Sequence, residues 1–464
     1  MALSPLVNPW VLQAFLRNTL WAPGRLEGRS AADLASLRDR GLRGVVRVAG
    51  GTPLYQAKYR GIDLGRIRRI SDLSVLPLVS KQEIMGGYPE GTLPRGARRR
   101  AVPLNTSGST GKPVMFYTDF VTLSMAAGSF LRELRVYGLD WRRARSAHIG
   151  NFTPGKADEV FQRGFSERIR MVNTQKNMLM ANTFEPMKDL LGKLDVFRPD
   201  AIISYPVTFQ HLAHLKKKGL GEHVRPKVLM CGGYVLDEYT RRYVEDAFGC
   251  RMVNVYGAAE SGADIAFECL EGTWHMNHDL FQVEVVDEHQ QLVAEGVTGH
   301  LVLTRLFGSG TPFIRYTGID DWVAVQGETS CACGLRTPTF KHGVVGRAST
   351  CVILPDGRVF PAASFAILNY ALRDLKTFKV RQYQIVQEKI DEIDIRLVFD
   401  EEQRDVGPSV ELIIERVRKA YEEKAGPKVK ITVHEVKEIP SPAGKPAPLV
   451  ISKVTLEEGF KLIE

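Results

Sequence analysis

The sequence has few cysteines and no long apolar run, and both absences exclude whole classes of protein. Six cysteines in 464 residues are too few for a disulfide framework, so a cytoplasmic, reducing location is expected. No stretch reaches about 18 consecutive apolar residues, which excludes a transmembrane helix. The segment from Met1 to Trp21 lacks a basic part followed by an unbroken apolar part, so a signal peptide is not expected either.

The surplus of positive charge is small. The chain has 62 Lys and Arg against 53 Asp and Glu, a net charge of +9 at pH 7, which is a weak indication of anionic partners such as phosphate groups. The basic run Arg95–Arg100 is interpreted as a solvated loop, so we expect no nucleic-acid partner. Hydrophobic residues make up 44% of the chain, as in ordinary globular proteins, and the length allows roughly three domains or subdomains.

Alternating strand and helix patterns predict a doubly wound α/β core. Short apolar runs at 201–205, 227–231 and 252–256 are separated by helix-length segments at 207–218 and 236–248. Strand and helix alternating at intervals of about 25 residues are typical of a parallel sheet with crossover helices. The ligand crevice of such a sheet lies beyond the carboxyl ends of its strands.

The pattern changes twice after residue 280. Alternating strands at 281–287 and 300–305 predict an antiparallel β subdomain. A small α+β module follows, with three strands around one charged helix, at 381–387, 392–399, 429–436 and 410–424. We therefore expect a large α/β domain over residues 1–347 and a small, mobile α+β lid domain over residues 348–464.

The most specific motif is a run of hydroxyl-bearing residues and glycines. It consists of Thr106, Ser107, Gly108, Ser109, Thr110, Gly111, Lys112 and Pro113. Hydroxyl groups and glycine amides can surround phosphate oxygens, and the lysine adds a positive charge. Because three residues separate Gly108 from Lys112 and a proline follows the lysine, this is not a Walker loop. The run predicts a phosphate-binding loop ahead of a helix at 120–137.

This run resembles the signature loop of the adenylate-forming superfamily. Two further segments, LPLVSK at 76–81 and YGAAE at 256–260, resemble the phenylacetate–CoA ligase branch, which includes CapK-like proteins. The resemblance implies an AMP-forming ligase that uses ATP and Mg²⁺ to activate a carboxylic acid, with an aryl acid as one substrate class, and transfers the acyl group to coenzyme A. An amine or hydroxyl acceptor, transfer of AMP itself, a degenerate nucleotide-binding protein and a homodimer stay open as alternatives.

The resemblance also implies roles for single residues around the nucleotide. Tyr256 would stack on the adenine, because an aromatic ring suits a flat heterocycle, and Gly257 follows it in the motif. Glu260 would bind the Mg²⁺ that bridges the phosphates, since a carboxylate suits this hard cation. The turn that would flank the adenine consists of Gly232, Gly233 and Tyr234.

Residues of the later motifs complete the implied site. Asp320 would accept hydrogen bonds from the ribose hydroxyls, with Asp321 as its rival. Arg347 would reach ribose or phosphate, and Lys445 would bridge the substrate carboxylate and the α-phosphate. The residues expected to act in catalysis are Lys445, Glu260 and Thr106.

Three positions depart from the pattern of the family. Ala259 stands where the family has Ser or Thr, which removes a hydroxyl that a water or Ser261 would have to replace. Ser349 stands where the family has a hinge carboxylate, and Tyr234 where it usually has a small or acidic residue. Candidate walls of the acyl pocket are Tyr205, Pro206, Phe209 and Tyr234.

Four sulfur and nitrogen ligands form a candidate metal site. Cys331 and Cys333 share a turn, and Cys269 and His275 lie upstream, which suits a closed, tetrahedral, structural zinc site. Some members of the branch carry a similar arrangement. His278 is the alternative nitrogen ligand, and free buried thiols are the competing interpretation.

Overall fold

The computed structural model describes most of the chain, namely residues 13, 24–105, 114–154, 158–160, 177–347, 350–441, 447–454 and 461–462. The chain divides into two compact units. The first unit comprises Met1–Ala144, Asn151–Met178 and Val255–Val344. The second comprises Arg145–Gly150, Leu179–Asn254 and Val345–Glu464.

The first unit begins with helices and a short hairpin. Its helical elements are α2 (Arg25–Gly28), α3 (Ala31–Gly50), α4 (Pro53–Lys58), η2 (Leu64–Arg66), η3 (Ile70–Val75), α5 (Lys81–Gly87), η4 (Ala97–Arg100) and α6 (Phe120–Val136). The hairpin consists of β1 (Ala101–Asn105) and β2 (Met115–Asp119), which pair antiparallel. The predicted helix after the phosphate loop is thus confirmed as α6, which Asp119 caps by accepting the amide of Thr122.

The later part of the first unit is the predicted antiparallel subdomain. Its strands lie in the order β10-β11-β12-β13-β9-β8-β7, and the described pairs β10–β11, β11–β12, β13–β9, β9–β8 and β8–β7 are antiparallel. The strands are β7 (Arg251–Gly257), β8 (Asp264–Glu268), β9 (Trp274–Met276), β10 (Phe281–Val286), β11 (Thr298–Arg305), β12 (Asp321–Ser330) and β13 (Arg336–Arg347). The first four residues of β7 and the last three of β13 belong to the second unit.

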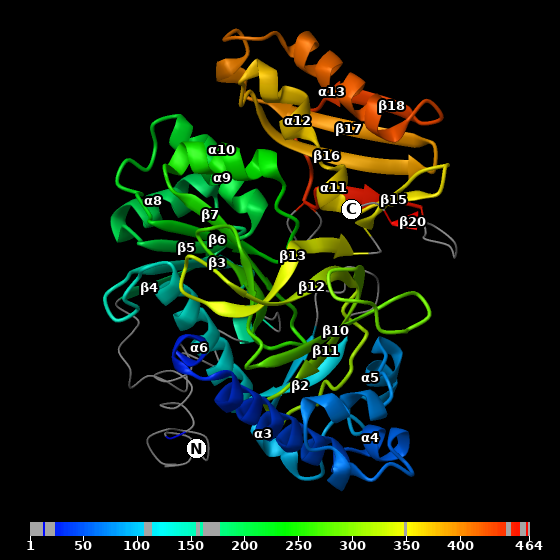
Figure 1. Ribbon diagram of the computed structural model, residues 1–464. Helices are drawn as coiled ribbons and strands as arrows, with labels where there is room; N and C mark the ends of the chain where they lie inside the picture. Colours follow the sequence, from blue (N-terminus) through cyan, green and yellow to red (C-terminus); the bar gives the residue numbers. More distant parts are fainter. Residues whose placement is uncertain are drawn as a thin grey trace. The chain divides into compact units, whose positions relative to one another are not determined.

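The second unit contains the predicted parallel strands and crossover helices. Strands β3, β5 and β6 pair parallel, and α8, α9 and α10 pack on them around a buried core (Figure 1). The elements are β3 (Ser146–Gly150), β4 (Met178–Asn182), α8 (Met187–Phe197), β5 (Ala201–Ser204), α9 (Pro206–Lys217), β6 (Val228–Gly232) and α10 (Glu238–Phe248). The α/β fold class is confirmed, with strand positions within two residues of the prediction.

The C-terminal part of the second unit is the predicted α+β module with additions. Its four-stranded sheet has the order β18-β17-β16-β19, and a second small sheet has the order β14-β15-β20. The elements are β14 (Val352–Ile353), β15 (Arg358–Phe360), α11 (Ala362–Phe365), α12 (Leu368–Leu372), η7 (Arg373–Leu375), β16 (Val380–Lys389), β17 (Glu392–Phe399), η8 (Glu401–Gln403), α13 (Val410–Ala425), β18 (Lys430–Glu435), β19 (Val450–Ser452) and β20 (Lys461–Leu462).

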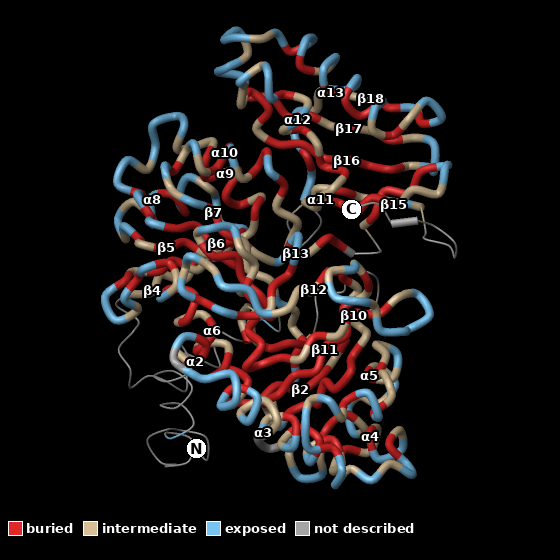
Figure 2. The backbone as a smooth tube through the Cα atoms, viewed as in Figure 1, coloured by how far each residue is buried: buried red, intermediate tan, exposed pale blue. Residues whose placement is uncertain are grey.

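The C-terminal module shares a core with α10. Tyr239 of α10 is buried among residues of the module, including Val380 and Tyr383, and its hydroxyl donates to the carbonyl of Val380 at 2.6 Å. In Figure 2 the central strands β16 and β17 of the module carry mostly buried residues, as expected for strands that face a core. The domain boundary after residue 347 stays a prediction. Among the described helices, none is long and apolar enough to cross a membrane.

Candidate active site

Several predicted site residues fall outside the part of the chain that the structure describes. These are the loop residues from Thr106 to Pro113, the hinge position Ser349, and Lys445. Arg347 is the last residue of β13, and only its backbone is described. The phosphate loop connects two described strands, because Asn105 at the end of β1 pairs with Met115 at the start of β2.

Tyr256 and Asp321 are brought together in the first unit. The hydroxyl of Tyr256, at the end of β7, donates to the Oδ2 of Asp321 at 2.8 Å. Asp321 begins β12 and is buried, whereas its neighbour Asp320 is half-buried. Of the two rival carboxylates, Asp321 is therefore the one beside the aromatic ring predicted to bind adenine.

Glu260 is buried in the same unit, beside Tyr316. The hydroxyl of Tyr316 lies 3.4 Å from the Oε1 of Glu260 and donates to it. Burial raises the pKa of Tyr316, and the adjacent Glu260 carboxylate raises it further, so the phenol keeps its proton and remains a donor. The main-chain carbonyl of Glu260 accepts from Nη1 of Arg305 at 3.1 Å. A carboxylate held at both its side chain and its backbone is well oriented for a hard cation such as Mg²⁺.

The hydroxyl of Ser261 does not stand in for the one missing at Ala259. Its Oγ accepts from the amide of Ala258 at 3.0 Å and lies within hydrogen-bond distance of the carbonyls of Ala258 and Ala263, at 2.6 and 2.7 Å. Ser261 is fully buried. Because these partners are all in its own loop, the hydroxyl stabilises the turn that carries Glu260 and is not available to a substrate.

The predicted adenine-flanking turn follows β6 in the second unit. Gly233 has a φ of +77°, and a Cβ there would lie 3.3 Å from the ring of Tyr205, so the turn requires glycine. Tyr205 and Tyr234 meet edge to face, with ring centroids 5.5 Å apart. Phe209 is not a pocket wall: it is fully buried in the core under α9, where its ring packs among apolar side chains.

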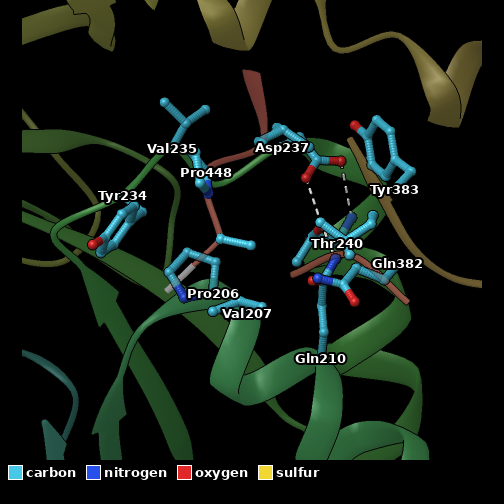
Figure 3. A pocket seen from close by; sticks show the side chains of 13 residues that line it. Pro206, Val207, Gln210, Tyr234, Val235, Asp237, Thr240, Gln382, Tyr383 and Pro448 are labelled. Carbon is cyan, nitrogen blue, oxygen red and sulfur yellow. Dashed lines mark hydrogen bonds between the residues drawn. The ribbon is translucent and has the colours of Figure 1, made fainter. Parts of the chain in front are cut away.

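A pocket in the second unit is lined by the beginnings of α9 and α10, by β16, and by chain on both sides of residues 442–446 (Figure 3). Tyr234 lies on one side, and Asp237 and Thr240 lie on the other. Gln210 donates to the hydroxyl of Thr240 at 2.7 Å. The lining residues are Pro206, Val207, Gln210, Tyr234, Val235, Asp237, Thr240, Gln382, Tyr383, Ile439, Ala447, Pro448 and Leu449.

The four predicted metal ligands come together in the first unit. One ligand atom from each of Cys269, His275, Cys331 and Cys333 lies within 4.8 Å of all the others. Cys269 lies in the turn after β8, His275 lies in β9, and Cys331 and Cys333 lie in the turn between β12 and β13. His278 is not part of this cluster, so the structure favours His275 as the nitrogen ligand.

The geometry and electrostatics of this cluster fit a tetrahedral ion. For ligands about 2.3 Å (sulfur) and 2.0 Å (nitrogen) from a tetrahedral zinc, two sulfurs lie about 3.8 Å apart and a sulfur and a nitrogen about 3.5 Å apart. The sulfurs of Cys269 and Cys331 are 3.7 Å apart, and that of Cys333 lies 3.2 Å from Nε2 of His275. Burial lowers the pKa of His275 to about 4, so the ring is neutral at pH 7 and can bind a metal. Thr337 bonds its other nitrogen at 2.9 Å, as second-shell residues do.

Sequence reasoning missed the buried support beneath Glu260. Arg305 ends β11 and is 1% exposed, and Asp119 caps α6. The sequence LVLTR at 301–305 carries no signal of this burial, because an arginine at a strand end is normally solvated and is rarely fully buried without partners. Its partners are far away in the sequence and could not be identified from it.

The chain is similar to CoA ligases both in sequence and in structure. No protein-family model matches the chain. It is 28% identical over 375 residues to phenylacetate-coenzyme A ligase of Thermus thermophilus, covering 75% of this chain and 77% of that protein. It is 26% identical to the Escherichia coli enzyme, covering 73% and 76%, and 23% identical to protein CapK of Staphylococcus aureus, covering 72% and 71%.

Solved structures share the fold. A 2-hydroxyisobutyryl-CoA ligase in its postadenylation state matches with a TM-score of 0.76 at 18% identity, over 93% of this chain and 92% of that one. The same ligase in an open conformation matches with a TM-score of 0.61, over 95% and 93%. The fold of the adenylate-forming ligases, expected from the sequence motifs, is therefore confirmed.

Proposed function

We propose that this chain, a homologue of the phenylacetate–CoA ligases and CapK, activates a carboxylic acid with ATP and transfers the acyl group to coenzyme A. The observation that carries this proposal is the arrangement in the first unit. There Tyr256 is paired with Asp321 at 2.8 Å, and Glu260 is held by Tyr316 and Arg305. An aromatic ring beside a carboxylate suits a nucleoside, and an oriented glutamate suits the Mg²⁺ of bound ATP.

The first step is an in-line displacement at phosphorus. A carboxylate oxygen of the substrate forms a bond to the α-phosphorus while the bond from that phosphorus to the β-bridging oxygen breaks, and pyrophosphate leaves. Such chemistry depends mainly on positioning and on neutralising charge. Glu260 orients the cation that offsets the phosphate charge, the loop Thr106–Pro113 binds phosphate oxygens, and Lys445 offsets charge on the carboxylate and the α-phosphate.

The second step transfers the acyl group. The thiol sulfur of coenzyme A attacks the acyl carbon, the bond from that carbon to the AMP oxygen breaks, the thiol proton is lost to solvent, and AMP leaves. The pocket in Figure 3 supports a role for the C-terminal module. Pro448 follows Lys445 by three residues and shares this pocket with Tyr234 of the predicted adenine-flanking turn.

Exchange of radiolabelled pyrophosphate into ATP, across a panel of aryl and aliphatic acids, tests the first step. The wild type should exchange with at least one acid, and Glu260→Gln should lower the rate by about a hundredfold or more, the scale of losing one electrostatic contact to a developing charge. Glu133→Gln is the matched control, because Glu133 is a fully buried carboxyl of α6 with no role in the proposed mechanism. Absence of exchange with every acid would instead favour a nucleotide-binding protein without ligase activity.

The acceptor is tested by trapping. Hydroxylamine converts an acyl-adenylate into a hydroxamate, so its formation without coenzyme A reports the first step alone. With coenzyme A added, a thioester should replace the hydroxamate. Continued hydroxamate formation with no thioester would point to an amine or hydroxyl acceptor.

The cluster of Cys269, His275, Cys331 and Cys333 is a structural zinc site in this proposal. Burial raises the pKa of Cys269, and it raises that of Cys333 to about 12, so a bound cation is what would hold these sulfurs as thiolates. All four ligand positions come from the protein, which is typical of structural zinc. The ion would tie the turn after β8 to the turn after β12, and its thiolates suit a reducing compartment such as the cytoplasm.

Metal analysis of the purified protein tests this site. We expect one zinc per chain in the wild type and in Cys250→Ser, whose half-buried thiol lies outside the cluster. Cys331→Ser should lose the zinc. A wild-type protein without stoichiometric zinc, and unaffected by Cys331→Ser in thermal unfolding, would disprove the zinc site.

A further inference from the structure

Arg305 lies at the centre of a buried network in the first unit. Its guanidinium group is 1% exposed and forks between two main-chain carbonyls. Nη1 donates to Glu260 at 3.1 Å, and Nη2 donates to Thr311 at 2.7 Å. Phe307 and Phe313 lie 5.6 and 5.3 Å from it through cation–π contacts. One side chain thus joins the loop that carries Glu260 to the segment around Thr311.

The segment around Thr311 is itself attached to the hairpin that carries the phosphate loop. The amide of Thr311 donates to the carbonyl of Tyr117 in β2 at 2.9 Å. The amide of Tyr117 donates to the hydroxyl of Thr311 at 3.0 Å. Strand β2 begins at Met115, one residue after the end of the segment 106–113. Thr311 therefore connects Arg305 to the strand that follows the predicted phosphate loop.

Asp119 supplies the opposite charge for this network. Its Oδ1 accepts the amide of Thr122 at 2.8 Å, and its Oδ2 accepts the amides of Ser309 and Gly310, the latter at 2.6 Å. Burial lowers the pKa of Arg305 to about 10, and the Asp119 charge opposes that shift. The guanidinium is therefore charged at pH 7, and hydrogen bonds from a charged donor are stronger than neutral ones.

We propose that Arg305 is a positioning residue: it fixes the Glu260 backbone to the hairpin of the phosphate loop, so that the cation on Glu260 and the phosphates meet in a fixed geometry. This inference rests on the proposed function of Glu260. Lysine cannot replace the arginine here, because a single ammonium group lacks the planar fork that reaches two carbonyls. Arg305→Lys should therefore keep the buried positive charge but lose the pair of hydrogen bonds that joins the carbonyls of Glu260 and Thr311.

ATP binding measured by calorimetry, without any acid substrate, tests this link apart from catalysis. The quantity is the ratio of ATP affinities with saturating Mg²⁺ and with EDTA. We expect Mg²⁺ to tighten ATP binding to the wild type, and the ratio to fall by about tenfold in Arg305→Lys, the size of losing one charged hydrogen bond. Glu260→Gln should abolish the tightening. Arg132→Lys is the matched control: Arg132 is also fully buried, and it donates to Asn277 and Asp279, which lie outside the Glu260 loop, so its ratio should equal that of the wild type.

The outcomes separate the two proposals. If Mg²⁺ does not tighten ATP binding to the wild type, the role of Glu260 is wrong, and the role of Arg305 with it. If Glu260→Gln loses the tightening and Arg305→Lys keeps it in full, only the positioning role is overturned. Should Arg305→Lys fail to fold, Asp119→Asn decides, because an asparagine cannot accept at both oxygens as Asp119 does. Its ratio should also fall, and a wild-type ratio would overturn the inference.

Discussion

The replacement Gly262→Ala probes the loop of Glu260 without touching a charged group. Gly262 follows Glu260 by two residues, has a φ of +70°, and lies against Thr122 so closely that a Cβ would overlap the γ-methyl of that threonine. Two separate penalties therefore apply to alanine. One comes from the left-handed backbone and the other from the contact.

The size of each penalty can be worked out from this geometry. A left-handed φ costs a non-glycine residue about 1 to 2 kcal/mol, and forcing an extra methyl group into a packed contact costs about 1 to 3 kcal/mol. Gly262→Ala should thus lower the free energy of unfolding by about 2 to 5 kcal/mol. Gly138→Ala is the matched control, because Gly138 has a φ of +74° but nothing within 4 Å of a Cβ. Gly138→Ala should lower the free energy of unfolding only by the backbone penalty of about 1 to 2 kcal/mol.

Urea unfolding of both variants measures the difference between their free energies of unfolding. The rate of pyrophosphate exchange into ATP reports whether Glu260 keeps its position. The double variant Gly262→Ala with Thr122→Ser removes the overlapping methyl group and should regain the contact part of the stability. The exchange rate of Gly262→Ala should fall well below that of Gly138→Ala, because the loop must shift to admit the new Cβ. Equal unfolding energies for the two single variants would refute the close approach of this loop to α6.

Two further predictions concern stability. Burial alone would raise the pKa of Asp279, but the bidentate contact with Arg132 lowers it below its usual value. Its stabilising contribution is therefore complete above about pH 4 and is lost as the pH falls through the lowered pKa. Asp279→Asn should cost about 3 to 5 kcal/mol of unfolding free energy at pH 7, as breaking a buried ion pair does, and should show a smaller loss in acid, measured by urea unfolding at pH 7 and pH 3. Tyr239→Phe leaves the carbonyl of Val380 without its donor, so hydrogen exchange of β16 should be faster, whereas Tyr370→Phe, at an exposed position, should leave it unchanged.

The sequence predicted those elements whose periodicity is local. The parallel strands and their helices, and the antiparallel strands after residue 280, were found within two residues because an apolar run or an alternation is fixed by neighbouring residues. The four candidate metal ligands were predicted from residue type, since sulfur and imidazole groups in two short segments suggest a common site. Their meeting within 4.8 Å depends on pairing between β9 and β13, in which Thr339 faces His275.

Contacts between residues far apart in the chain could not be predicted from the sequence. Nothing in the alternation of β11 distinguishes Arg305 from a solvated arginine at a strand end, because the carbonyls of Glu260 and Thr311 that make its burial tolerable are supplied by turns elsewhere. The sequence left Asp321 as a rival of the predicted Asp320 for a related reason. The two carboxylates are adjacent in the chain, and only the start of β12 decides which of them is buried beside Tyr256.

The absence of a hydroxyl at Ala259 has a physical consequence for the whole site. Since Ser261 is committed to the backbone of its own turn, the loop gains rigidity but offers no side-chain donor in place of the missing one. Among the described residues of the first unit, the Glu260 carboxylate and the buried guanidinium that holds its backbone are groups that can orient charge. A site with fewer donors to a developing anion depends more on the accuracy with which those that remain are placed. This is why Arg305 should affect the rate of the first step although it touches neither nucleotide nor acid in the proposed mechanism.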